Sequence, residues 1–179
     1  MTSTPTTVLI RPMQMDDLEY VLEIDRLSFN LPWPASAYHY ELNENPRSLL
    51  YVAEAAQPDG NGRVVGMVVV WMVLDEGHIA NIAVHPEYRS RGIGRRLLVT
   101  ALQEAIQKGA RQATLEVRLS NIAAQNLYRQ FGFDVAGSRP HYYRDNSEDA
   151  LIMTAHNLGE AYSNRLRNHR GDEGGQPWR

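Results

Sequence analysis

A β-strand, a loop of glycine and arginine, and a strongly patterned helix follow one another in the middle of the sequence. β-Forming residues dominate 78–84, and the loop Arg89-Ser90-Arg91-Gly92-Ile93-Gly94 leads into the segment 95–108. This segment repeats apolar residues at helical intervals, and Gly109 stands where a C-terminal cap belongs. A strand joined in this way to an amphipathic helix favours an α/β fold, in which helices cover a sheet.

The rest of the sequence alternates between the spacing of a strand and the spacing of a helix. Predicted helices cover 18–27, a segment through Tyr38 and Leu42 that ends at Asn45-Pro46, 95–108, and 121–131. Predicted strands cover 8–11, 49–56, 64–74, 78–84, 113–117, 133–139 and 149–156. The predicted order is β-α-α-β-β-β-α-β-α-β-β, an α/β fold with a mixed sheet.

The length of 179 residues fits a single domain. We expect residues 1–158 to form that domain. From Gly159 the sequence is polar and rich in glycine, and it holds too few apolar residues to offset the entropy lost on folding. We therefore expect 159–179 to be a flexible tail.

Charge and composition exclude several classes of protein. A net charge of −3 and a pI near 6.1 argue against direct binding of nucleic acid. The absence of cysteine excludes disulfides, thiolate-bound zinc and a cysteine nucleophile, and we expect no metal. The polar segment 1–7 lacks a signal-peptide pattern, and the longest apolar run, 64–74, is too short to span a bilayer. We expect a cytoplasmic protein without membrane contact, as a monomer or a weak dimer.

The glycine and arginine loop has the features of a phosphate site. Backbone N–H groups at a helix start have no partner within the helix and can bind an anion. Gly92 and Gly94 allow a ligand to approach the backbone, and Arg89, Arg91 and Arg95 add positive charge. An isolated Gly-x-Gly is more often an ordinary loop, but here it precedes a strong helix. The sequence has neither Gly-Lys-Ser/Thr nor a third glycine at dinucleotide spacing, which leaves another phosphate-bearing cofactor.

At this point the chain resembles the GNAT acetyltransferase family. The family signature, Arg/Gln-x-x-Gly-x-Gly/Ala after a strand that ends in Val-x-Pro, is matched by the segment from Val84 to Gly94. The resemblance covers about residues 8–157 and includes the predicted order of elements. It implies the GNAT acyl-CoA N-acyltransferase fold and acetyl-CoA as cosubstrate.

Within this family the chain is most similar to the RimI-type ribosomal-protein alanine N-acetyltransferases. The similar blocks are 73–76, 81–84, 115–118, Ser120-Asn121 and Leu127-Tyr128. In the family the loop amides hold the pyrophosphate of coenzyme A, and the preceding strand lends backbone groups to the pantetheine arm. The resemblance thus implies these cofactor contacts: Ile82, Ala83, Val84, Arg89, Ser90, Arg91, Gly92, Ile93, Gly94, Arg95 and Asn121.

Three residues are candidates for the chemistry. Glu116 places a carboxylate in an otherwise apolar strand, where a charge is costly without a partner or a purpose. Its alternative role is a structural ion pair, with Arg118 or with an arginine from elsewhere. The resemblance assigns Glu116 as general base and Tyr128 as acid, although Tyr128 could also be a core aromatic. His78 is a second candidate base, against the simpler interpretation of a strand or surface histidine.

Reference pKa values limit these roles. Proton transfer from a phenol, with a pKa of about 10, to a thiolate, at about 8.5, is uphill by roughly 2 kcal/mol. We therefore expect Tyr128 to stabilise the leaving thiolate by a hydrogen bond. An α-amine, with a pKa of about 8, needs some 3 kcal/mol less deprotonation work than a lysine amine at neutral pH. A single modest base such as Glu116 suits an α-amine better.

The acceptor is predicted from the same resemblance. Trp33, Tyr142 and Tyr143 lie in loops that border the acceptor side in this family, although Trp33 and one of the tyrosines could serve packing alone. We expect direct acetylation of the N-terminal amine, alanine, of a small-subunit ribosomal protein. The alternatives are acetylation of a lysine or small-molecule amine, and a noncatalytic module that binds coenzyme A.

Overall fold

The computed structural model of the chain describes residues 7–58 and 60–168. It divides into two compact units. The first comprises Met1–Val69 and Asn81–Thr100, and the second Val70–Ala80 and Ala101–Arg179. Strands β3 (Gly62–Val73) and β4 (Glu76–Val84) and helix α3 (Ile93–Gln107) each contribute residues to both units.

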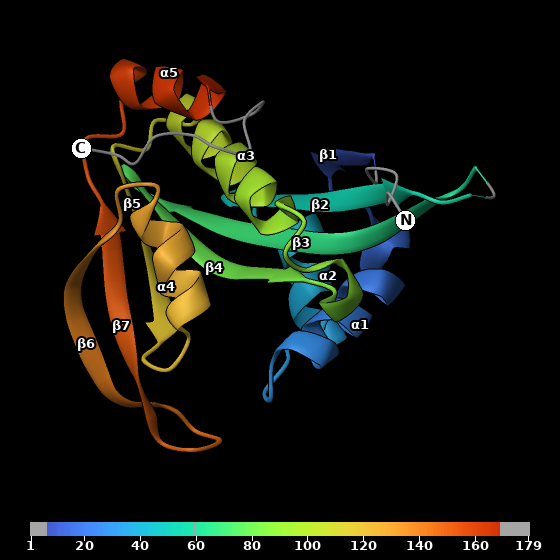
Figure 1. Cartoon of the computed structure of the whole chain (residues 1–179), viewed down its shortest axis with the longest axis horizontal. Helices are drawn as coiled ribbons and strands as arrows, with labels where there is room; N and C mark the ends of the chain where they lie inside the picture. The colour runs from blue at the N-terminus through green and yellow to red at the C-terminus, as the bar shows by residue number, and fades with distance from the viewer. Residues whose placement is uncertain (1–6, 59, 169–179) are drawn as a thin grey trace. The chain divides into compact units, whose positions relative to one another are not determined.

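Hydrogen bonding links seven strands in the order β1-β2-β3-β4-β5-β7-β6. The sheet is mixed, since β4 and β5 pair in parallel while β1–β2, β5–β7 and β6–β7 are antiparallel. The elements follow the predicted order, which confirms the GNAT fold (Figure 1). One helix that was not predicted, α5 (Glu160–Asn168), follows the last strand.

The first unit holds two helices and the strands that precede and follow them. Its elements are β1 (Val8–Pro12), α1 (Leu18–Ser28), α2 (Ala35–Asn43), β2 (Ser48–Ala56), and its parts of β3, β4 and α3. Val8 of β1 lies opposite Ala55 of β2. The residues Val64–Val69 of β3 are all buried, as expected for a strand covered on both faces.

The second unit consists of the rest of β3, β4 and α3, followed by β5 (Gln112–Arg118), α4 (Ile122–Arg129), β6 (Asp134–Tyr143), β7 (Glu148–Ala155) and α5 (Glu160–Asn168). Strands β6 and β7 form a long hairpin (Figure 1). Its register shifts between Val135 and Gly137 and again between Arg139 and Tyr143. Strand β6 was predicted to end at Arg139, but it continues through Pro140 to Tyr143.

Helix α5 differs from the flexible tail predicted after Gly159. Tyr162 and Leu166, four residues apart, are buried on one face of α5, and the Tyr162 hydroxyl donates to the Phe131 carbonyl at 2.6 Å. Full burial of a leucine contributes about 1.5–3 kcal/mol, so two well-placed apolar residues suffice to dock a polar helix. The remainder of the predicted tail, 169–179, lies outside the described residues. Across 7–58 and 60–168, no helix is long and apolar enough to cross a membrane.

Candidate active site

The loop before α3 belongs to the first unit and has the backbone of an anion site. Ser90 and Gly92 adopt left-handed conformations, with φ of 59° and 75°. A Cβ at Gly92 would meet no atom within 4 Å, so its backbone conformation, rather than lack of space, favours glycine. Helix α3 begins directly afterwards at Ile93. The first amides of a helix have no partner within the helix and lie at its positive dipole end, so they can attract a phosphate.

Two of the predicted cofactor arginines also hold this loop in place. The Arg89 Nε donates to the Val84 carbonyl at 2.9 Å, and a terminal nitrogen of Arg89 donates to the Ser28 hydroxyl at 3.1 Å. Arg91 donates to the Glu87 carbonyl at 2.9 Å. The loop is therefore shaped before any ligand binds, and its arginines keep a positive charge beside the helix start.

A buried polar network fixes the loop that carries Trp33. Asp25 of α1 is fully buried, and its carboxylate accepts the Trp33 N–H at 2.6 Å and the Asn81 side-chain amide at 3.0 Å. The same amide lies 3.0 Å from the Tyr38 hydroxyl. Burial raises the pKa of Asp25, and the hydrogen bonds from Asn81, Trp33 and Tyr38 oppose that rise. This network was not predicted from the sequence. Its signal was an aspartate on the buried face of α1, beside Val21 and Ile24.

Glu116 lies in the second unit, on β5, where buried and partly exposed residues alternate. The pairing of β4 with β5 places His78 opposite Thr114, two residues before Glu116 on the same face. The His78 Nε2 is 3.1 Å from one oxygen of Glu116, and the Arg139 Nε is 3.3 Å from the other. His78 also stacks on Trp71, with ring centroids 5.7 Å apart. The carboxylate of Glu116 is thus held between an imidazole and a guanidinium.

These partners determine the charge of Glu116. The hydrogen bond with His78 lowers the pKa of Glu116 most, burial opposes it, and the charge of Arg139 lowers it further. The carboxylate is ionised at neutral pH. An ion pair with Arg118, one of the alternatives drawn from the sequence, does not form: Arg118 pairs with Asp145 and Glu148 instead. The arginine from elsewhere in the chain is Arg139.

Tyr128 and Asn121 belong to α4 and its N-terminal cap. Tyr128 is 6% exposed and its ring centroid lies 5.9 Å from that of Phe133. Burial and the neighbouring Tyr143 raise the pKa of Tyr128, so its hydroxyl stays protonated and can donate a hydrogen bond but transfers its proton less readily. The Asn121 side chain accepts the Ala124 N–H at 3.1 Å and so caps α4.

The tyrosine pair lies at the end of β6. The rings of Tyr142 and Tyr143 meet edge to face, with centroids 5.2 Å apart. Tyr142 is 46% exposed, whereas Tyr143 is half-buried under the Arg118 guanidinium, 3.8 Å from its ring centroid. Burial raises the pKa of Tyr143 to about 12. Tyr142 is therefore the tyrosine of this pair that is open to a ligand, and Tyr143 serves packing as well.

Comparison with known sequences decides the family. Residues 18–133 match the profile of the Acetyltransferase (GNAT) family. The chain belongs to the GNAT acetyltransferase family. It is accordingly an acetyltransferase, and acetyl-CoA is the cosubstrate of this family. The family match draws on residues of both units.

Relatives of this GNAT chain include named enzymes. Ribosomal protein bS18-alanine N-acetyltransferase of Escherichia coli (strain K12) is 36% identical over 146 residues, which cover 80% of this chain and 94% of that protein. A Bacillus subtilis (strain 168) protein, named provisionally for the same activity, is 41% identical over 148 residues, 83% of this chain and 95% of that one. The crystal structure of the ribosomal-protein-S18-alanine N-acetyltransferase from Escherichia coli superposes with a TM-score of 0.74 at 33% identity and covers 84% of this chain and 94% of its own.

The residues present fit the cosubstrate of the family. The left-handed Ser90 and Gly92, the start of α3 and the adjacent arginines suit a pyrophosphate, a group with several anionic oxygens. Among the described residues, no group of three or more His, Asp or Glu side chains could hold a metal ion.

Proposed function

We propose that this GNAT chain acetylates the N-terminal α-amine, alanine, of a small-subunit ribosomal protein, with acetyl-CoA as donor. The observation that carries the proposal is the ionised Glu116 on β5, in contact with His78 on β4. An ionised carboxylate is a proton acceptor of the kind that amine acetylation needs. The relatives named for alanine N-acetylation, at 36% identity or more across most of both chains, support the choice of acceptor.

Donor binding is assigned to the first unit. We propose that the amides and side chains of Arg89, Ser90, Arg91, Gly92, Ile93, Gly94 and Arg95 hold the pyrophosphate, and that the backbone of Ile82, Ala83 and Val84 holds the pantetheine arm. The donor supplies the activated acetyl group. The left-handed turn at Ser90 and Gly92 supports the first assignment, because it leads directly into the positive dipole end of α3. Asn121 is proposed as a further contact.

Proton removal is assigned to Glu116. Transfer from an α-ammonium group, with a pKa of about 8, to a carboxylate with a pKa below 4.5 is uphill by at least about 5 kcal/mol. We therefore infer that the amine attacks in its neutral form and that Glu116 accepts its proton, directly or through water, as the new C–N bond acidifies the nitrogen. His78 contacts the same carboxylate at 3.1 Å and is the alternative acceptor.

The leaving group and the acceptor are assigned to aromatic residues. Tyr128, whose hydroxyl stays protonated, donates a hydrogen bond to the developing thiolate. We propose that Trp33, Tyr142 and Tyr143 each contact the acceptor chain. The fixation of Trp33 by Asp25 and the exposure of Tyr142 support these roles, because rigid aromatic surfaces bind a peptide at low entropic cost.

Peptide acetylation tests the proposal. Three peptides are compared: one with a free N-terminal alanine, the same peptide with a blocked N-terminus, and a blocked peptide with a free lysine. Mass spectrometry is expected to show one added acetyl group on the first peptide alone. Modification of the lysine peptide would favour a lysine acetyltransferase. Binding of acetyl-CoA without transfer to any peptide or protein extract would favour a noncatalytic module.

We also propose a cellular compartment, a domain organisation and an oligomeric state for the enzyme. We place it in the cytoplasm, where its acceptor is made, and the absence of cysteine fits a reducing compartment. We propose that residues 1–158 act as one catalytic domain, since the family match spans residues of both units. A monomer or weak dimer is expected to elute at the corresponding mass in gel filtration.

A further inference from the structure

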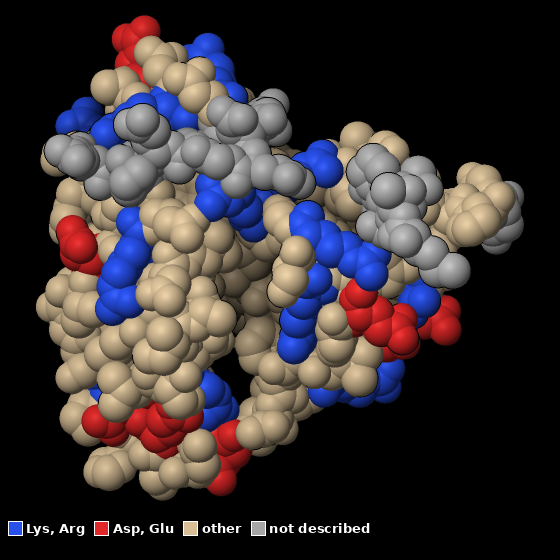
Figure 2. All heavy atoms as spheres, in the orientation of Figure 1, with Lys and Arg blue, Asp and Glu red and all other residues tan. Residues whose placement is uncertain are grey.

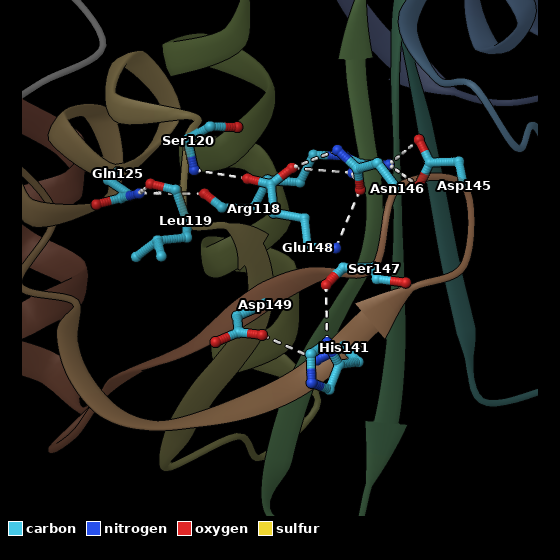
Figure 3. Close-up of polar contacts among 10 residues, drawn as sticks. All are labelled: Arg118, Leu119, Ser120, Gln125, His141, Asp145, Asn146, Ser147, Glu148 and Asp149. Carbon is cyan, nitrogen blue, oxygen red and sulfur yellow. Dashed lines mark hydrogen bonds and ion pairs between the residues drawn. The ribbon is translucent and has the colours of Figure 1, made fainter.

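Arg118, at the end of β5, binds three side chains of one turn. Its guanidinium donates to both carboxylate oxygens of Asp145 at 2.9 Å, and to Glu148 and Asn146 at 3.1 Å each (Figure 3). The three acceptors lie in the four-residue segment 145–148, which joins β6 to the start of β7. Paired, charge-assisted hydrogen bonds of this kind are among the stronger polar contacts in proteins and have a defined geometry.

The contacts continue from Arg118 back to α4. The second oxygen of Glu148 accepts the Ser120 N–H at 2.7 Å. Gln125 of α4, 3% exposed, donates its side-chain amide to the carbonyls of Arg118 at 3.1 Å and Leu119 at 2.9 Å. Figure 3 shows this line of contacts from Gln125 through Arg118 to Asp145. Gln125 therefore fixes the backbone at Arg118, and the Ser120 N–H fixes Glu148, one partner of the guanidinium.

The end of the hairpin depends on such side-chain contacts, because its backbone ladder is irregular. The register shifts between Arg139 and Tyr143, and both His141 and Ser147 adopt positive φ, at 52° and 56°. Left-handed backbone at a residue other than glycine costs on the order of 1 kcal/mol. The His141 N–H donates to Asp149 at 2.8 Å, and the His141 ring lies 3.1 Å from the Ser147 carbonyl. Acidic and basic side chains lie together over this end of the hairpin (Figure 2).

The same guanidinium also touches the tyrosine pair. It lies 3.8 Å from the ring centroid of Tyr143, and Tyr143 in turn supports Tyr142 edge to face. We propose that Arg118 is a positioning residue for the acceptor: by binding Asp145 and Glu148 it fixes the β6–β7 turn, and by covering Tyr143 it sets the tyrosine wall against which the acceptor chain binds. The inference rests on the acceptor role proposed above for the two tyrosines.

Two substitutions test it against a matched control. Arg118→Gln removes the guanidinium, and Arg118→Lys keeps the charge but not the paired geometry. Arg144→Gln, in the same hairpin, removes the charge of an exposed arginine for comparison. For each full-length variant, kcat and the KM of the alanine peptide and of acetyl-CoA are measured. Hydrogen exchange of the segment 140–149 is followed by mass spectrometry.

For Arg118→Gln the KM of the peptide is expected to rise at least about tenfold, since small displacements of positioning groups have effects of this size. The kcat and the KM of acetyl-CoA change less than about threefold, and exchange in 140–149 becomes faster. Arg118→Lys is expected to fall between wild type and Arg118→Gln, and Arg144→Gln to match wild type. If Arg118→Gln does not fold, the peptide KM and hydrogen exchange of Arg118→Lys decide.

Three results would overturn the inference. Unchanged exchange in 140–149 would show that Arg118 does not order the turn. Faster exchange with an unchanged peptide KM would separate the turn from acceptor binding. An equal loss in all kinetic parameters together with a lower Tm would indicate a purely structural role. A wild-type enzyme that acetylates no free N-terminus would instead refute the proposed function, and the inference with it.

Discussion

Replacement of Glu116 by glutamine is the sharpest test of the chemistry, because the structure separates its effect on activity from its effect on stability. The substitution keeps the shape of the side chain and removes its charge. Arg139, one of its two partners, is 54% exposed, and an exposed pair of this kind contributes about 0–1 kcal/mol. The contact with His78 is more buried, and a hydrogen bond to a charged group contributes about 1.5–3 kcal/mol.

The expected loss of stability is about 1–3 kcal/mol after allowance for the retained amide contacts, and each kcal/mol lowers Tm by about 2–4 °C in a protein of this size. The expected loss of kcat is larger. A general base accelerates a reaction about 10²–10⁴-fold, equivalent to about 3–5 kcal/mol in the activation free energy. Folded Glu116→Gln enzyme should thus be nearly inactive at a temperature well below its Tm.

The pH dependence gives a second, independent readout. The pKa of Glu116 is lowered, so its carboxylate stays ionised throughout the range in which the enzyme is assayed. The wild-type rate is expected to rise with pH until the α-amine is neutral, near about pH 8. Glu116→Gln should show the same rise at a lower level.

His78→Gln is the control for the alternative base. If Glu116 is the base, this variant loses less kcat than Glu116→Gln and keeps the pH profile. Turnover of Glu116→Gln within about threefold of wild type, measured by acetyl-CoA consumption with the alanine peptide, would refute the role of Glu116. A greater loss and an altered pH profile in His78→Gln would transfer that role to the imidazole.

Three further predictions follow from the structure. Tyr128→Phe removes only a hydroxyl and should lower kcat about 10- to 100-fold, with little change in either KM or in Tm; an unchanged kcat in steady-state assays would argue that Tyr128 serves packing alone. Gly66→Ala places a methyl group 3.2 Å from the Ala83 carbonyl and 3.0 Å from Leu97. It should lower the free energy of unfolding, measured by thermal unfolding, by about 1–3 kcal/mol. It should also raise the KM of acetyl-CoA more than the KM of the peptide. Equal changes in both KM values would contradict this. Glu148 has a pKa of about 2 in the folded protein against an ordinary 4.5, so its stabilising effect is present above pH 4.5 and is lost as pH falls towards 2. The free energies of unfolding of wild type and Glu148→Gln in urea should therefore differ at pH 7 and converge in acid. A difference that persists at low pH would contradict the assignment.

The sequence by itself determined the features that depend on neighbouring residues. The period of apolar residues identified α3, and Gly109 ends it with a φ of 96°. Asn121 caps α4 as its residue type predicts. The order of strands and helices follows from such local patterns, and so does the left-handed turn at Gly92 before α3, because glycine conformation is a local property.

Only the tertiary structure decided which side chains meet. Glu116 could have paired with Arg118, two residues away on the same face, but the pairing of β4 with β5 brings it His78, and Arg139 of β6 supplies the second partner. Arg118 is drawn to the turn between β6 and β7, where three acceptors converge.

The same holds for the residues that the sequence analysis missed. Asp25 meets Asn81 across 56 positions of the chain. Leu166 is buried although its helix is polar. Residues so far apart meet because strand register and helix docking are set by the burial of the whole core, and a local pattern shows that a side chain needs a partner without showing which partner the fold provides.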